Sequence, residues 1–117
     1  MIERPLDFTL NPYHPLADGL VFAGLGQHPG SSRYHDSSLY GNHGTLTNMD
    51  PATDWISELR RLALDFDGSS NYVEGPCPLG ASPTQFTLSL WFNGTVNDQR
   101  LIESRDNDSP NNGYQLY

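Results

Sequence analysis

The sequence predicts an all-β domain made of short antiparallel strands, and three observations support this expectation. Gly, Pro, Asn, Asp and Ser, the residue types that favour turns, account for 50 of the 117 residues. Apolar and polar residues alternate with a period of two along 62–67 and 86–92, which is the pattern of a half-buried strand. Six Tyr, five Phe and two Trp supply bulk for a core, which separates this composition from that of a disordered chain.

Six strands are expected from these patterns. They are residues 20–25, 44–47, 62–66, 72–74, 86–92 and 100–103, and a seventh strand begins at 113–117. The turn at 68–71 is expected to join two of them into a β-hairpin, because Asp67-Gly68 is a strong hairpin signal. Leu64 and Phe66 on one layer, and Leu88 and Leu90 on the other, are expected to point inward.

The only helical signal lies in residues 51–61. Pro51 suits a first helical position, Asp50 suits the N-cap, and Asp54 stands at a capping-box position. We expect one or two helical turns there.

The length allows one domain, and we divide the chain into an N-terminal lead-in, residues 1–19, and a β-sandwich domain, residues 20–117. Pro5, Pro12 and Pro15 exclude a regular helix from the lead-in. Because the chain stops inside an alternating apolar run at 113–117, we expect the sandwich to be incomplete at its C-terminus and to belong to a larger multidomain chain.

The charge narrows the classes of partner. The formal net charge is -8, with no lysine and six arginines, so a nucleic acid or an anionic membrane surface is not expected as a partner. No apolar run approaches the length of a membrane span, so we expect no membrane insertion. Acidity of this kind suits divalent cations, neutral ligands such as sugars, or solubility alone. Cys77 is the only cysteine, so no disulfide is expected within the chain.

Four segments together resemble the laminin-G-like family of the concanavalin A-like lectin/glucanase jelly rolls, found in secreted bacterial and phage-associated proteins. They are residues 14–21 (HPLADGLV), 36–46 (DSSLYGNHGTL), 63–73 (ALDFDGSSNYV) and 86–92 (FTLSLWF). The second is similar to the family's Asp-Ser-Ser-Gly-Asn-Gly-Asn-His-Gly-Thr stretch. The resemblance implies a two-sheet antiparallel jelly-roll sandwich. The chain departs from the family at residues 24–29, where it has Gly-Leu-Gly-Gln-His-Pro in place of the family's acidic, Gly-rich segment. It also lacks the family's later strands.

The motif at 36–46 has a physical interpretation of its own. Asp36 is expected to accept backbone N–H groups through an Asx-turn, and Gly41, Asn42 and Gly44 tolerate a positive φ. The segment is therefore expected to turn tightly before a strand at Thr45.

Oxygen-bearing side chains predict a calcium site, because Ca²⁺ takes six to eight hard oxygen ligands. The candidate ligands are Asp36, Asn42, Asp65, Asp67 and Asn71. The alternative is that Asp67 and Asn71 serve their own turn while Asp36 caps its own loop.

The four histidines, His14, His28, His35 and His43, lack the spacing of metal ligands on a helix. His28 and His35 belong to one loop and can meet there. His43 is expected to pack beside Tyr40 or to hydrogen-bond the turn.

Trp91 and Tyr72 are the candidate ligand-binding residues, with Trp55 a weaker one. If the Phe86 and Leu88 face fills the core, Trp91 lies on the opposite face, where an aromatic ring can stack on a sugar. The alternative is that Trp91 packs against a neighbouring element. No carboxylate pair, Gly-x-Ser-x-Gly motif or phosphate loop is present, so no catalytic residue is nominated.

We therefore expect a non-catalytic binding or structural module of a larger secreted or phage-associated protein, extracellular or virion-associated, that binds carbohydrate or a protein surface. No secretory signal is visible at the N-terminus. Two alternatives stay open: a ligand-free structural spacer, and the start of a concanavalin A-like glycoside hydrolase. The related glucanases use a Glu-x-Asp-x-x-Glu run, and this chain has no such run, because Glu103 and Asp106 match only part of it.

Overall fold

The computed structural model of the chain describes residues 10–58, 61–76, 79, 84–94, 100–103 and 115–116. The chain divides into two compact units, Met1–Pro78 and Leu79–Tyr117. Several sequence-based predictions lie partly outside the described residues: the lead-in before Leu10, residues 59–60 of the expected helix, Asp106, and residues 113, 114 and 117 of the last strand.

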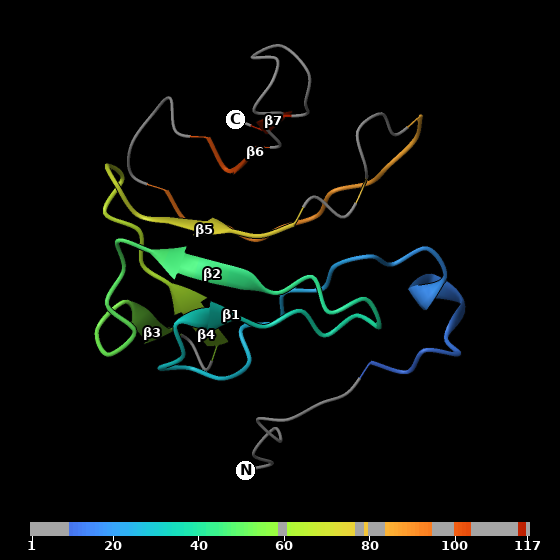
Figure 1. Ribbon diagram of the computed structural model, residues 1–117, viewed down its shortest axis with the longest axis horizontal. Helices are drawn as coiled ribbons and strands as arrows, with labels where there is room; N and C mark the ends of the chain where they lie inside the picture. Colours follow the sequence, from blue (N-terminus) through green and yellow to red (C-terminus); the bar gives the residue numbers. More distant parts are fainter. Residues whose placement is uncertain are drawn as a thin grey trace. The chain divides into compact units, whose positions relative to one another are not determined.

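The central sheet of the first unit has three antiparallel strands in the order β1-β2-β5 (Figure 1). They are β1 (Arg33–Tyr34), β2 (Gly44–Thr47) and β5 (Tyr72–Glu74). Arg33 pairs with Thr45 on one side of β2, and Leu46 pairs with Val73 on the other. Gly44 and Leu46 are buried while Thr45 is exposed, so β2 has the period of two that its sequence predicts.

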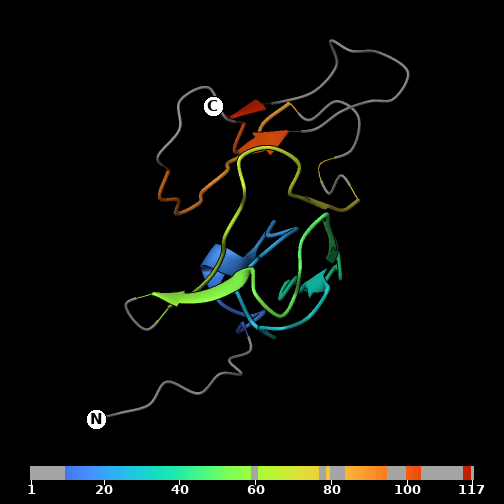
Figure 2. The same cartoon turned by 90° about the vertical axis from the view of Figure 1, so that its left-hand side faces the viewer.

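A separate two-stranded antiparallel sheet joins β3 (Trp55–Glu58) to β4 (Arg61–Leu64). The register runs from Trp55↔Leu64 to Glu58↔Arg61, which makes a tight hairpin. Figure 2 shows this hairpin, in yellow-green, extending away from the strands of the central sheet. The described residues of the second unit include the strand pair β6 (Ile102–Glu103) with β7 (Gln115–Leu116). Arg100 Nη1 lies 2.8 Å from Glu103 Oε2.

The prediction of an all-β chain is confirmed. Every strand pair in the described part of the chain is antiparallel, and its helical content is the single 3-10 turn η1 (Pro15–Ala17). Among the residues described, no helix is long and apolar enough to cross a membrane.

A row of three aromatic rings links distant segments of the first unit. Tyr34 stacks on Trp55 with centroids 5.9 Å apart, and on Phe22 at 6.3 Å. Trp55 also donates its indole N–H to the carbonyl of Ser31 at 2.9 Å. Trp55 therefore has a structural role, which does not support its weaker candidacy as a ligand residue. Beside this row, Leu46 is the one buried hydrophobic side chain among the described residues.

The helical prediction for 51–61 is wrong, because Asp50 to Asp54 form a hydrogen-bonded turn and the described residues that follow are strands. Asp50 O accepts from the N–H of Thr53 and of Asp54, and Asp50 Oδ1 accepts from Ala52 N–H. Asp54 Oδ2 reciprocates by accepting from Asp50 N–H at 2.8 Å. The chain then enters β3, because Trp55 and Ile56 have high β propensity and the hairpin offers them a partner.

The predicted hairpin between 62–66 and 72–74 is wrong. β4 pairs with β3, and β5 pairs with β2. The carboxylate of Asp67 anchors a wide loop in place of a two-residue turn, so the chain can reach a different sheet. Phe66 lies beyond the end of β4 and is 49% exposed, in contrast to the inward orientation expected for it, while Leu64 is half-buried.

The strands predicted at 86–92 and 20–25 also differ. Residues 84–94 are not a strand, Leu88 is 37% exposed and Leu90 is half-buried. An alternating segment forms a strand only when a neighbouring strand pairs with it, and none does so within the described residues. Residues 20–25 are extended but make a single antiparallel bridge, Gly24↔Asp36.

Replacing Gly44 by alanine is expected to destabilise the first unit. A Cβ at this buried position would collide with Cγ1 of Val73 on the neighbouring strand. Overpacking of this kind costs about 1–3 kcal/mol, measurable as a lower urea midpoint with an unchanged slope. Gly94→Ala is the matched control, because a Cβ there stands 3.8 Å from the Phe92 ring, an ordinary contact. Equal midpoints for the two variants would contradict the register of β2 against β5.

Candidate functional site

The loop between β1 and β2 is built around the carboxylate of Asp36, whose side chain is 2% exposed. Its Oδ1 accepts from the N–H of Ala23 at 2.8 Å and of Ser38 at 2.9 Å. Its Oδ2 accepts from the hydroxyl of Ser38 and the N–H of Asn42, both at 2.7 Å. The prediction that Asp36 takes backbone N–H groups is confirmed. Of the three residues expected to tolerate a positive φ, Gly41 adopts one, at 64°.

This arrangement fixes the charge state of Asp36. Burial acts to raise its pKa, but the hydrogen bonds from Ser38, Ala23 and Asn42 outweigh it, so the pKa lies below its usual value of 3.8. Asn42 adds a second tie by donating its side-chain amide to Val21 O at 2.7 Å. The ionised carboxylate thus ties the 36–42 loop to residues 21–23.

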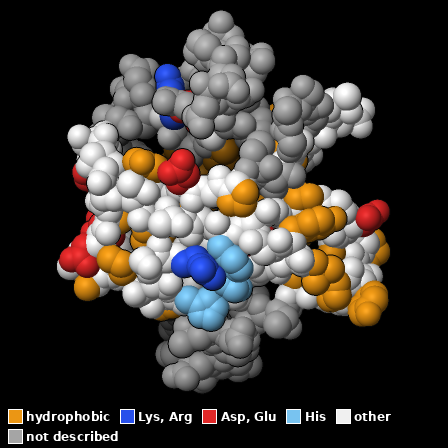
Figure 3. Space-filling model, viewed as in Figure 1, with side chains coloured by type: hydrophobic (Ala, Val, Ile, Leu, Met, Phe, Trp, Pro, Cys, Tyr) orange, Lys and Arg blue, Asp and Glu red, His pale blue; other side chains and the backbone are white. Residues whose placement is uncertain are grey.

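Three histidines form a row beside this loop. The rings of His28 and His35 have centroids 4.8 Å apart, and those of His35 and His43 are 4.7 Å apart. His43 Nδ1 accepts the N–H of Asp36 at 3.0 Å, so the predicted bond from His43 to the turn is confirmed. Histidine side chains gather around a cation on this face of the molecule (Figure 3), and Arg33 is the cation that acts on His35.

Sequence reasoning foresaw the contact of His28 with His35 but missed the complete row. The intervals between the three histidines, seven and eight residues, lie in turns and short strands, so no single regular element carries all three rings. The row arises because β1 and β2 return the chain on itself, and because His28 adopts a left-handed conformation with φ of 63°. Nothing in the local sequence signals either feature.

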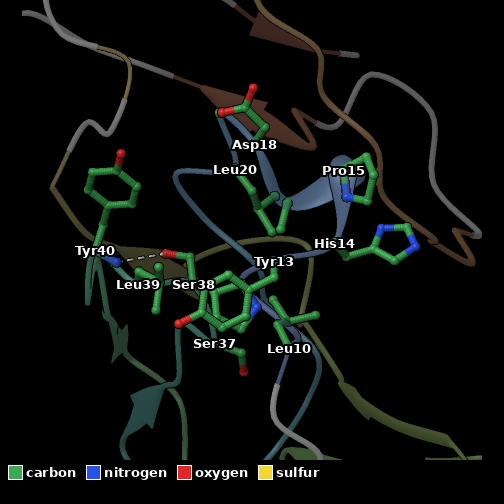
Figure 4. Close-up of a pocket in the computed structure, with 13 residues that line it drawn as sticks. Leu10, Tyr13, His14, Pro15, Asp18, Leu20, Ser37, Ser38, Leu39 and Tyr40 are labelled. Atoms are coloured by element: carbon green, nitrogen blue, oxygen red, sulfur yellow. Dashed lines mark hydrogen bonds between the residues drawn. The ribbon is translucent and has the colours of Figure 1, made fainter.

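A pocket of about 340 Å³ lies between the η1 region and the 37–40 loop. The His14 imidazole caps η1 by accepting Leu16 N–H at 3.1 Å, and Tyr40 N–H donates to Ser38 Oγ at 3.2 Å. Figure 4 shows Tyr13 at the centre of the hollow and Tyr40 and Asp18 at its edge. The Tyr13 side chain is 92% exposed and that of Tyr40 is 66% exposed.

The predicted ligand residues Trp91 and Tyr72 lie in different units of the chain. Trp91, in the second unit, is 92% exposed, and Tyr72, on β5 of the first unit, is 47% exposed. Both side chains are accessible to solvent. The exposure of Trp91 agrees with the expectation that its ring is displayed on the surface. Neither residue lines the pocket at η1.

The predicted metal ligands fall into separate groups. Asp36 and Asn42 precede β2, whereas Asn71 donates its side-chain amide to Asn48 O, just after β2. Asp67 Oδ1 accepts the N–H of Ser69, Ser70 and Asn71. The two groups therefore lie at opposite ends of one strand.

The carboxylate oxygens of Asp36 and Asp67 already have protein donors. Hydrogen bonds from Ser69, Asn71 and Ser70 lower the pKa of Asp67 from 3.8 to about 2. Asp65 is exposed and its backbone N–H donates to Asp54 O. No three His, Cys, Asp or Glu side chains converge as metal ligands in the described ranges. Calcium binding at these five residues stays a prediction.

Comparison with protein-family models, with curated proteins and with solved structures gave no match in any of the three.

Asp36→Asn is expected to destabilise the chain by about 2–5 kcal/mol, because an amide nitrogen would face donors that now have a carboxylate oxygen. The measurement is urea unfolding at neutral pH. Asp65→Asn, which alters an exposed carboxylate, is the control and should change stability by less than about 0.5 kcal/mol. A loss no larger than that of the control would show that the loop does not depend on this charge.

The first unit is expected to lose stability on mild acidification. Burial, then the charges of His43 and His28, lower the pKa of His35 below 6.5. A lowered histidine pKa means that the unfolded state binds more protons, so this contribution is complete above pH 6.5 and is lost as pH falls below it.

The check is the urea midpoint between about pH 7.5 and pH 5.5 for the native chain and for His35→Gln. The native midpoint should fall more steeply than that of the variant. Parallel curves would mean that the row of imidazoles does not couple protonation to folding.

Proposed function

We propose that the chain is a non-catalytic binding module that takes carbohydrate as its ligand, built on a two-sheet antiparallel jelly roll of the laminin-G-like kind. The all-β architecture is in keeping with such a fold. The similarity of residues 36–46 to the family's motif adds support, because the carboxylate of Asp36 holds this segment in place with four hydrogen bonds. In this segment Asp36 accepts the hydrogen bonds that hold the loop, a role that any fold with this motif would need.

The observation that most favours a binding role is the display of large apolar side chains. Eleven of them are exposed in the described residues, and eight of these are aromatic. Aromatic rings on a β-scaffold offer apolar area at a small entropy cost, and sugar rings present apolar C–H faces to them. Trp91 and Tyr72 remain our candidate contacts in this proposal.

The acidic charge supports the ligand class. A chain with net charge -8 repels anionic ligands and suits neutral ones. We place the module in a larger secreted or virion-associated protein, where it would bind glycans or glycan-coated surfaces. Calcium, if it takes part, would be held by the predicted oxygen ligands.

The proposal predicts that the full chain is retained on an array of neutral glycans and leaves the glycans intact. Trp91→Ala should weaken retention about tenfold if its ring stacks on the sugar, since such a contact contributes on the order of 1 kcal/mol. Release of reducing sugar would instead identify the glycoside hydrolase alternative. A folded chain that retains no glycan would favour the ligand-free spacer and overturn the proposal.

A further inference from the structure

The pocket between η1 and the 37–40 loop has three features of a ligand site: preformed walls, displayed aromatic rings and an unengaged carboxylate. It is formed wholly by the first unit. Its volume of about 340 Å³ lies at the lower end of the range for small-molecule pockets, so it suits one or two sugar rings.

Both walls are held by hydrogen bonds that do not depend on a ligand. On one side, η1 is fixed by His14 through Leu16 N–H and by Asp18 N–H, which donates to Pro15 O at 3.4 Å. On the other side, Ser38 is held by both oxygens of Asp36. A preformed site loses little conformational entropy when it binds, which favours affinity for a small ligand.

The ring of Tyr13 lies within this hollow and that of Tyr40 lies at its edge, and both have most of their surface in solvent (Figure 4). Leu39, in the 37–40 loop, is 82% exposed and adds to the apolar surface of the pocket. Exposed aromatic and aliphatic groups gathered on a pocket are unusual on a soluble surface and mark a binding site. Each tyrosine also offers a hydroxyl that can donate and accept hydrogen bonds.

The polar side chains that line the pocket determine which chemical class of ligand it can bind. The hydroxyls of Ser37 and Ser38 are engaged with Gln27 and Asp36, whereas the exposed carboxylate of Asp18 accepts no hydrogen bond from the described residues. A carboxylate can accept from two neighbouring hydroxyls at once, as vicinal sugar hydroxyls require. None of the described residues that line the pocket is a lysine or an arginine, so they offer no counter-charge to phosphorylated, sulfated or uronic ligands.

We propose that this pocket binds a neutral saccharide, with Tyr13 and Tyr40 stacking on the sugar and Asp18 accepting from its hydroxyls. The assignment rests on the proposed carbohydrate-binding function and adds to it the location of the site and the charge class of the sugar. It also adds a site that is distinct from Trp91 and Tyr72.

The test is isothermal titration of the full chain with the neutral glycan that the array retains best. Tyr13→Ala and Tyr40→Ala should each weaken binding about tenfold or more, and Tyr40→Phe should keep most of the affinity because the stacking face remains. Asp18→Asn should weaken binding while circular dichroism stays native. Phe66→Ala, which removes an exposed aromatic ring outside the pocket, is the matched control and should bind as the native chain does.

The outcomes distinguish a failure of the pocket assignment from a failure of the proposed carbohydrate-binding function. If Trp91→Ala loses binding while both tyrosine variants bind normally, the pocket assignment is overturned and carbohydrate binding stands. If a quaternary ammonium probe binds the pocket and neutral glycans do not, the assignment to neutral sugars falls, since two tyrosines and a carboxylate would then be selecting a cation. If the native chain retains no glycan, the function and the pocket assignment fall together.

Discussion

The buried carboxylate of Asp36 is the constraint on which the first unit depends. It accepts four hydrogen bonds at 2.7–2.9 Å, and these fix residues 23, 38 and 42 around one point. A buried charge is costly unless all of its acceptor sites are satisfied, so the loop has little freedom to rearrange while Asp36 is ionised. The Gly24↔Asp36 bridge and the bond from Asp36 N–H to His43 Nδ1 extend the same constraint to two further segments.

This constraint couples features that are distant in sequence. One side of the 36–43 loop forms a wall of the η1 pocket, and the other side holds His43 at the end of the row of imidazoles. The row of imidazoles contacts the loop through the bond from Asp36 N–H to His43 Nδ1, whereas a ligand in the pocket would act on Ser38 and Tyr40. A ligand that holds the loop in place should therefore oppose its loss in acid, because both effects act on the same folded segment.

The sequence predicted the features that depend on neighbouring residues and failed where the partner is distant. The Asx-turn at Asp36, the capped turn at Asp50 and the strand at Thr45 all follow from local chemistry, and all three are present. The alternation at 86–92 and the hairpin at Asp67-Gly68 were misread, because a period of two shows that a segment can pair but does not specify its partner. The row of histidines and the η1 pocket were missed for a related reason: both join segments whose approach is set by how the chain turns back.

The balance between core and polar contacts explains why the loops dominate this chain. Leu46 is the one buried hydrophobic side chain among the described residues, and the aromatic row at Tyr34 supplies the main additional packing. With so little apolar burial, the fixed geometry of the described loops must come from hydrogen bonds to Asp36, Asp50 and Asp67. Those hydrogen bonds fix the position of the backbone, and the large apolar side chains take no part in them. Tyr13, Leu39 and Tyr40 are therefore left on the surface of well-fixed loops, where they are available to bind a ligand.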